Sequence, residues 1–199
     1  MSSRQIIVVV TSDAASTSGS MQRYERVAGG SWRAVGDPAA IVVGRTGLAD
    51  VGAKREGDGK SPSGVLTLGT AFGFDASATT RLPYRQLRAA TECVDDTSSR
   101  FYNQIVERDS VERADWKSSE KMREIDQYRW GIVVNHNTPP ESGRGSCIFI
   151  HLWSGPGTST AGCTAMAGKD LDALLRWLDP AANPRLVQMT AAEYSRWTR

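Results

Sequence analysis

His151 and Cys163 are the residues of this chain best suited to covalent chemistry, and they bracket the stretch H-L-W-S-G-P-G-T-S-T-A-G-C. A cysteine thiol has a pKa of about 8.5, and a neighbouring imidazole can take its proton to leave a nucleophilic thiolate. Gly162 allows a tight turn before the cysteine, and the amides around Gly162 and Cys163 are candidate oxyanion donors. The pattern indicates a nucleophile and its base for acyl transfer.

Two other interpretations use the same residue types. Zinc would need two further ligands, but His136 is the only other histidine and neither C-x-x-C nor H-x-x-x-H occurs, so the sequence disfavours a metal site. A strand-end histidine beside a small core cysteine remains open on spacing alone. We therefore expect no metal and no cofactor, and the two residues are either a catalytic pair or a packing pair.

The elements that would position this pair are mostly short strands. Runs of apolar or β-branched residues predict strands at 6–10, 32–35, 41–43, 65–68, 132–134, 147–150 and 186–189. Glycine-rich turns separate them, and 11–20 is predicted to be a polar loop. The turn residues after His151 bring the chain back toward the strand end, which would place Cys163 within hydrogen-bond reach. The sequence predicts a mainly β fold in a single domain, residues 1–199.

One helix is clearly predicted, directly after the cysteine. Its apolar stripe has the spacing i, i+3, i+4, i+7 and consists of Leu171, Leu174, Leu175 and Leu178. Asp170 is expected to cap its N-terminus and Pro180 to end it. T-A-A-E at 190–193 has capping-box spacing for a last short helix.

Residues 107–129 are highly charged and show no continuous apolar face. Their large apolar side chains are Trp116, Met122, Ile125 and Tyr128. We expect a mixed helix and loop excursion over the sheet, which is either a solvated surface segment or a lid over a groove.

Composition narrows the classes of function. Hydrophobic residues make up 40% and charged residues 23%, with a net charge of +2 and no dense basic block, which disfavours nucleic-acid and membrane-surface binding. The apolar run at 6–10 is too short to span a bilayer or to form a signal-peptide core, so an export signal would have to lie outside this sequence. Three cysteines allow one disulfide, Cys93–Cys147, with Cys163 free, or three reduced thiols.

The order of the pair and its surroundings resemble the L,D-transpeptidase catalytic domain (YkuD-type) family. The resemblance rests on a histidine at a strand end, a short glycine-rich loop and then T-A-G-C. Further similar segments are K-R-E-G-D-G-K-S-P-S-G-V-L at 54–66, C-V-D-D at 93–96, Y-N at 102–103, D-W-K-S-S-E-K-M at 115–122 and G-S-C-I-F-I-H at 145–151. The commoner motif is S-H-G-C-I/V-R, so Thr160, Ala161 and Ala165 stand for its Ser, His and Arg. The chain thus resembles a subgroup with T-A-G-C.

The resemblance implies a β-sandwich or open barrel with the pair at one end, and a peptidoglycan L,D-transpeptidase activity. Cys163 would attack the diaminopimelate–D-Ala bond of a stem tetrapeptide, and an amine of a neighbouring stem would resolve the thioester. His151 would act as base and then as acid. Resolution by water would instead make an L,D-carboxypeptidase, and a third alternative is a non-catalytic peptidoglycan-binding module. Carbapenems acylate enzymes of this family.

The resemblance also implies further site residues and a cellular location. Candidate substrate contacts are Trp153, Thr160, Asn135, Tyr128 and Trp116, although packing or turn formation explains each of them as well. Peptidoglycan lies outside the cytoplasmic membrane, so we expect a periplasmic or cell-envelope protein, which favours the Cys93–Cys147 disulfide. The expected partners are peptidoglycan stem peptides and not nucleic acid, and we expect a monomer.

Overall fold

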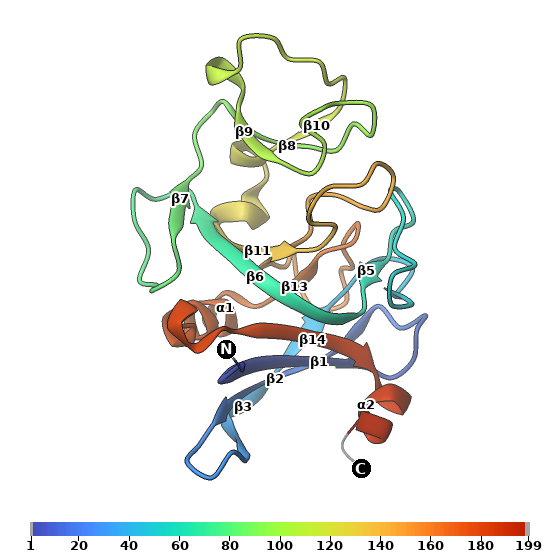
Figure 1. Cartoon of the computed structure of the whole chain (residues 1–199), viewed down its shortest axis with the longest axis vertical. Coiled ribbons are helices and arrows are strands. Elements are labelled where there is room, and N and C mark those ends of the chain that lie inside the picture. The colour runs from blue at the N-terminus through green and yellow to red at the C-terminus, as the bar shows by residue number, and fades with distance from the viewer. Residues whose placement is uncertain (1, 198–199) are drawn as a thin grey trace.

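The fold is built around one large mixed β-sheet, seen in a computed structural model that describes residues 2–197. Within this range nine strands form a sheet in the order β11-β12-β13-β3-β2-β1-β14-β6-β7, and β6 also pairs with β11, so the sheet closes on itself as a barrel (Figure 1). The strands are β1 (Gln5–Thr11), β2 (Ser18–Arg26), β3 (Trp32–Val42), β6 (Gly64–Gly73), β7 (Tyr84–Gln86), β11 (Trp130–Asn135), β12 (Phe149–Leu152), β13 (Thr164–Met166) and β14 (Arg185–Thr190). The prediction of a mainly β, barrel-like fold is confirmed.

The sequence did not predict several short strands, among them β13, which lies between Cys163 and the helix expected directly after it. Two further details of the strand prediction are wrong. The sequence predicts a polar loop over 11–20, whereas β2 begins at Ser18; Met21 is its only fully buried residue, so the strand has little apolar signal. The sequence also predicts a turn at G-D-P between 32–35 and 41–43, whereas β3 runs through it. Gly36 has a φ of +68°, and the register against β2 shifts between Met21 and Arg23, so a bulge absorbs the turn residues without ending the strand.

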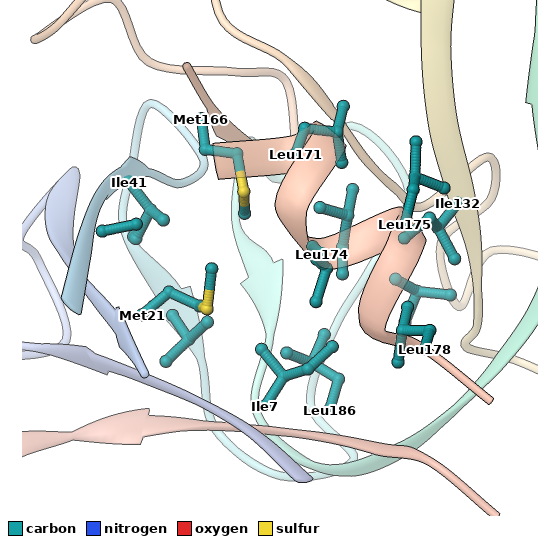
Figure 2. Packing of buried hydrophobic residues seen from close by; sticks show 14 of the residues in the cluster. Ile7, Met21, Ile41, Ile132, Met166, Leu171, Leu174, Leu175, Leu178 and Leu186 are labelled. Carbon is teal, nitrogen blue, oxygen red and sulfur yellow. The ribbon is translucent and has the colours of Figure 1, made fainter. Parts of the chain in front are cut away.

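The helix after the cysteine forms the centre of the core. α1 spans Gly168–Trp177, and its predicted leucine stripe is buried (Figure 2). It packs against side chains from six strands of the barrel, namely Ile7, Met21, Ile41, Ile132, Met166 and Leu186. Burial of so many apolar side chains on one short helix outweighs its missing side-chain cap.

The predicted ends of the helices are partly correct. The structure places Ala167 at the N-cap of α1 and Asp170 in the first turn, so the prediction that Asp170 caps the helix is wrong; at that position its carboxylate still favours the positive end of the helix. Pro180 lies beyond the C-terminus, as predicted. α2 (Ala191–Trp197) begins with the predicted capping box, in which Glu193 accepts from the Thr190 amide at 2.8 Å and donates its own amide to Thr190 Oγ1 at 3.3 Å.

The charged middle of the chain belongs to an excursion beyond one end of the barrel (Figure 1). It contains a three-stranded sheet of β8 (Thr91–Val94), β9 (Ile105–Glu107) and β10 (Ser119–Lys121), followed by short 3-10 turns η2 (Met122–Glu124) and η3 (Asp126–Arg129); η1 (Arg108–Ser110) follows β9. Met122 and Tyr128 are buried in a second apolar cluster that also contains Cys163. The excursion is therefore packed against the candidate nucleophile and is more than a solvated surface segment.

Two smaller features complete the fold. β4 (Leu48–Ala49) and β5 (Ser61–Pro62) form a short parallel pair that holds the 50–60 turn in place. No helix within residues 2–197 is long and apolar enough to cross a membrane.

Candidate active site

His151 and Cys163 line the same cavity, which has a volume of about 320 Å³. Its walls come from the turn around residues 54–57, from the excursion, and from residues 146–165. Pockets that hold small ligands have volumes of about 300 to 1,000 Å³. The predicted pair therefore faces one cavity whose volume lies at the lower end of the range for small-ligand pockets.

The His151 imidazole is held as a neutral base. The residue lies in β12, opposite Gly131 of β11 and Ala165 of β13, and is 7% exposed. Nδ1 lies 2.7 Å from the carbonyl oxygen of Leu152, and because a carbonyl can only accept, Nδ1 carries the hydrogen and Nε2 is left as the proton acceptor. Burial lowers the pKa of His151 to about 4, against the opposing effect of this hydrogen bond.

The Cys163 thiol is buried and hydrogen-bonded to the backbone. Sγ accepts from the Phe149 amide at 3.3 Å and donates to the carbonyl oxygen of Cys147 at 3.4 Å. Among residues 2–197 the thiol and the His151 imidazole make these backbone hydrogen bonds and show no hydrogen bond to each other. The Phe149 amide is a donor aimed at the sulfur, where it would stabilise a thiolate.

The surroundings of Cys163 keep it protonated at neutral pH. Burial raises the pKa of the thiol well above its ordinary value, and the negative charge of Glu120 raises it further. The Phe149 amide, the positive charge of Lys54 and the Tyr128 hydroxyl act in the opposite direction. A base such as His151 is therefore needed to remove the proton as a bond to sulfur forms.

Two hydroxyls fix the backbone of the nucleophile. Thr160 Oγ1 donates to the carbonyl oxygen of Cys163 at 2.6 Å, and Ser61 Oγ donates to the same oxygen at 2.9 Å. Thr160 Oγ1 also accepts from the Gly162 amide at 3.1 Å, so that amide is not free to act as an oxyanion donor as predicted. Gly162 is needed for close approach: a Cβ there would lie 3.0 Å from the Lys60 carbonyl oxygen.

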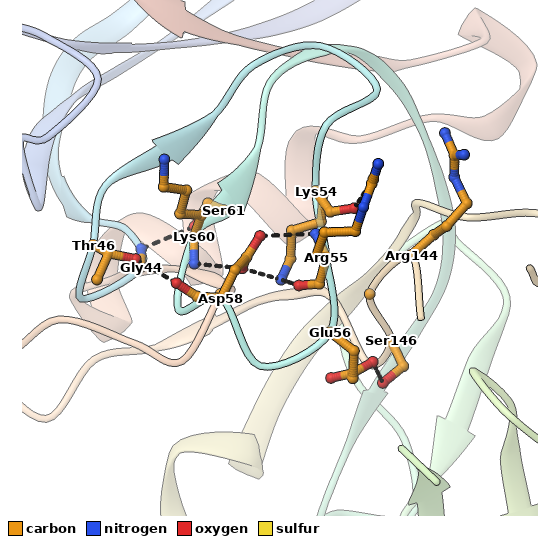
Figure 3. Close-up of polar contacts among 12 residues, drawn as sticks. Gly44, Thr46, Lys54, Arg55, Glu56, Asp58, Lys60, Ser61, Arg144 and Ser146 are labelled. Atoms are coloured by element: carbon orange, nitrogen blue, oxygen red, sulfur yellow. Dashed lines mark hydrogen bonds and ion pairs between the residues drawn. The ribbon is translucent and has the colours of Figure 1, made fainter. Parts of the chain in front are cut away.

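Lys54 is a buried cation in the wall of this cavity, and its role was not apparent from the sequence. It is 4% exposed, and Nζ donates to Asp58 Oδ1 at 2.6 Å and to the Arg55 carbonyl oxygen at 2.8 Å (Figure 3). A Cβ at Gly162 would lie 3.6 Å from Lys54 Cε, so the lysine stem packs beside the residue that precedes the nucleophile. Lys54 therefore brings a positive charge into the wall of the cavity.

Three carboxylates in the cavity wall were also missed. Glu56, Asp95 and Glu120 all line the cavity. Glu56 accepts from Ser146 Oγ at 2.7 Å, and Asp95 Oδ1 is buried without a hydrogen-bond partner in the described part of the chain. Burial raises the pKa of Glu120 to about 7. The only sequence signal was that these residues fall in R-E-G-D, C-V-D-D and S-E-K-M, segments already singled out by resemblance.

Three of the five candidate substrate contacts lie at the cavity. Trp153, Thr160 and Tyr128 all line it. The Thr160 hydroxyl donates its hydrogen bond to the Cys163 carbonyl oxygen, so its role in this structure is to hold the backbone. The Tyr128 ring packs edge-on against His151 with centroids 5.2 Å apart. Trp153 directly follows the last residue of β12 and forms part of the cavity wall.

The other two candidates lie outside the cavity and have structural partners. Asn135, at the end of β11, donates to Thr67 Oγ1 at 2.9 Å across the barrel sheet. Trp116 is buried within the excursion, where Nε1 donates to Glu92 Oε2 at 2.7 Å. The prediction of substrate contacts at these two residues is corrected, because neither lines the cavity and the side-chain N–H donor of each bonds elsewhere in the fold.

A disulfide joins the excursion to the nucleophile's surroundings. Cys93 in β8 is bonded to Cys147, with Cα atoms 6.0 Å apart, and Cys163 is the free cysteine of the described residues. Because the Cys147 carbonyl oxygen accepts from the Cys163 thiol, the cross-link ends one hydrogen bond from the candidate nucleophile. Within residues 2–197 no group of three or more His, Cys, Asp or Glu side chains is arranged to hold a metal ion.

Comparison with known proteins agrees with this arrangement. A family model described as the L,D-transpeptidase catalytic domain (YkuD) matches residues 4–187. No curated protein matches the chain. The matched range contains the whole cavity wall, the excursion and both members of the His–Cys pair.

Proposed function

This chain belongs to the family of L,D-transpeptidase catalytic domains, and on that premise we propose that it is a peptidoglycan L,D-transpeptidase of the cell envelope. The observation that carries the proposal is a free thiol and a neutral imidazole facing one cavity within the family's fold. A binding module would need neither group, which argues against a purely non-catalytic role.

The proposed reaction begins with attack by Cys163 on a stem tetrapeptide. Sγ bonds to the carbonyl carbon that links diaminopimelate to D-Ala, while His151 Nε2 takes the thiol proton. Because the free site holds the thiol and the imidazole both neutral, we expect the proton to move as the C–S bond forms and not beforehand. His151 then returns the proton to the departing D-Ala nitrogen, which leaves a thioester on Cys163.

The second half of the reaction frees the cysteine. An amine of a neighbouring stem attacks the thioester carbonyl, and His151 accepts the amine proton. The C–S bond breaks and His151 passes that proton to the departing sulfur, which leaves a crosslink and the free thiol. With Gly162's amide bound to Thr160, the Cys163 amide is the remaining candidate for stabilising the oxyanion from the predicted pair. Water in place of the amine would give an L,D-carboxypeptidase, the second candidate function.

Product analysis on purified disaccharide-tetrapeptide separates these outcomes. Crosslinked dimer with release of D-Ala supports the transpeptidase, and tripeptide alone supports the carboxypeptidase. Neither product from the folded protein would refute both. Acylation by a carbapenem, followed by intact mass, is an independent test. An adduct is expected on the wild type and on Ser159→Ala, a matched change in the cavity wall, but not on Cys163→Ala.

A further inference from the structure

The Tyr128 hydroxyl bonds to a carboxylate that the proposed mechanism does not use. Tyr128 is buried in η3, and its ring packs edge-on against His151, Phe149 and Phe72 with centroids 5.2, 5.4 and 5.8 Å away. Its hydroxyl donates to Glu120 Oε2 at 2.7 Å. With aromatic rings on several sides, Tyr128 has little freedom to turn, so the hydroxyl is held near Glu120.

The same residue shares its surroundings with the proposed nucleophile. Tyr128 and Cys163 belong to one buried cluster and line one cavity. The hydroxyl–thiol interaction contributes to the pKa of both groups. Tyr128 therefore bonds to the Glu120 carboxylate and belongs to the same buried cluster as the sulfur.

The backbone ties Glu120 to the nucleophile by a second route. Glu120 in β10 lies opposite Cys93 in β8, and Cys93 is bonded to Cys147. The Cys147 carbonyl oxygen accepts from the Cys163 thiol. The position of the carboxylate relative to the sulfur is thus set by a strand pair, a disulfide and a hydrogen bond.

The groups that face Glu120 make its negative charge costly. Burial raises the pKa of Glu120 to about 7; the Tyr128 hydrogen bond opposes this, and the carboxylates of Asp95 and Glu56 reinforce it. All four side chains line the cavity. Glu120 is therefore poised to gain or lose its proton near neutral pH.

The effect is mutual between Glu120 and Cys163. After burial, the charge of Glu120 is the main reason that the thiol keeps its proton, and Lys54 is the cation that opposes it. Two interacting acids of this kind titrate as a pair, because the ionisation of either one disfavours that of the other.

We propose that Glu120 is a positioning residue for Cys163, acting through the Tyr128 hydroxyl, so that the nucleophile loses its proton only while Glu120 is uncharged. The proposal rests on the proposed role of Cys163 as nucleophile. When Glu120 is ionised, Tyr128 donates to it and the carboxylate repels a charge on sulfur. When Glu120 is protonated, the Tyr128 hydroxyl can donate to a Cys163 thiolate instead.

The proton balance of the pair is simple. Below about pH 7 both Cys163 and Glu120 are protonated, and above it the prevailing form holds one proton on Sγ and none on Glu120. In the form of the free protein that an alkylating reagent attacks, the S–H bond is broken and an O–H bond exists on Glu120, so the total charge is the same. In the proposed turnover the thiol proton goes instead to His151 as the C–S bond forms, and Glu120 only has to be uncharged. Below about pH 7 each pH unit raises the fraction of protein with a Cys163 thiolate and a protonated Glu120 roughly tenfold. Above pH 7 this fraction levels off, because Glu120 has already lost the proton that this form requires.

The rate at which iodoacetamide alkylates Cys163, measured by intact mass from about pH 5.5 to 8.5, tests this directly. Cys163 is the free cysteine, and the other two are bonded to each other. The wild-type rate is expected to rise with pH and to level off near pH 7. Glu120→Gln, which keeps the size and the acceptor oxygen, should match the wild type below that pH, show no break, and react roughly tenfold faster one pH unit above it.

Glu124→Gln is the matched control, since Glu124 is an exposed residue of the same excursion. It should reproduce the wild-type profile. Absence of a break in the folded wild type, or a break that persists in Glu120→Gln, would overturn the proposal. The alkylation rate of Glu120→Gln divided by that of the wild type should be larger than the same ratio measured between Tyr128→Phe/Glu120→Gln and Tyr128→Phe. Equal ratios would refute the part assigned to the hydroxyl. The alkylation assay uses no peptidoglycan, so it can be interpreted even if the protein shows no transpeptidase or carboxypeptidase activity.

Discussion

His151 and Glu120 are expected to make the stability of this protein depend on pH in opposite directions. Burial lowers the pKa of His151 from 6.5 to about 4, so between these values only the unfolded chain binds the proton. The free energy of unfolding therefore falls as the pH drops from 6.5 to 4. At 1.36 kcal/mol per pKa unit, the change from this group is about 3 kcal/mol.

Glu120 has the opposite sign. Burial raises its pKa from 4.5 to about 7, so between these values the folded protein holds a proton that the unfolded chain has released. The free energy of unfolding therefore falls as the pH rises from 4.5 to 7, again by about 3 kcal/mol. In the wild type the two contributions nearly cancel over the shared window, and single substitutions are needed to reveal them.

Urea unfolding at pH 4.5 and pH 7 of the wild type, Glu120→Gln, His151→Gln and the double variant provides the assay. Relative to the wild type, Glu120→Gln should gain about 3 kcal/mol on going from pH 4.5 to 7, and His151→Gln should lose about the same amount. Glu124→Gln serves as the control and should show no change, since Glu124 is exposed. Differences between variants that do not vary with pH would refute the reasoning, because burial would then not separate the folded and unfolded pKa values.

Three further outcomes are expected. Replacing both Cys93 and Cys147 by Ser opens a loop with a sequence separation of 54 and should lower the free energy of unfolding by about 4 kcal/mol, measured by urea unfolding against the oxidised wild type; a loss below about 1 kcal/mol would contradict the cross-link. Leu174→Ala empties a fully buried position at the centre of the core and should cost about 2 to 5 kcal/mol in the same assay, whereas a loss typical of surface changes would show that the helix does not pack as described. Lys54→Met leaves the partly buried Asp58 without its cation and should cost about 3 kcal/mol, and it should also slow alkylation of Cys163, whose pKa Lys54 lowers; faster alkylation would contradict that effect.

Much of the barrel could be predicted from local patterns. Alternating and β-branched runs identified β1, β6, β11 and β14. A strand buried on one face shows alternating apolar residues, and one buried on both faces shows a continuous apolar run. β2 was missed because most of its side chains are partly exposed and polar, so its sequence lacks an apolar pattern. β3 was cut in two because G-D-P is strong turn chemistry, and only pairing with β2 shows that it forms a bulge.

The candidate site divides in the same way. Cys163 and His151 were identified by residue type and spacing, and Cys93 with Cys147 by parity and resemblance. Trp116 and Asn135 were placed at the groove because nothing local shows which way a side chain points. Their hydrogen bonds to Glu92 and Thr67 join segments far apart in the chain, and those pairings depend on the completed fold.

By itself the sequence determined the candidate pair, its order along the chain, the leucine helix that follows it and the family. These depend on residue types at short spacing, which the backbone converts directly into local structure. Only the tertiary structure decided the protonation states of the Cys163 thiol and the His151 imidazole. The thiol lies between Lys54, Tyr128 and Glu120, which are separated from it by long stretches of chain. A pKa reflects burial and the charges nearby in space, and the closed barrel with its disulfide-tied excursion sets both.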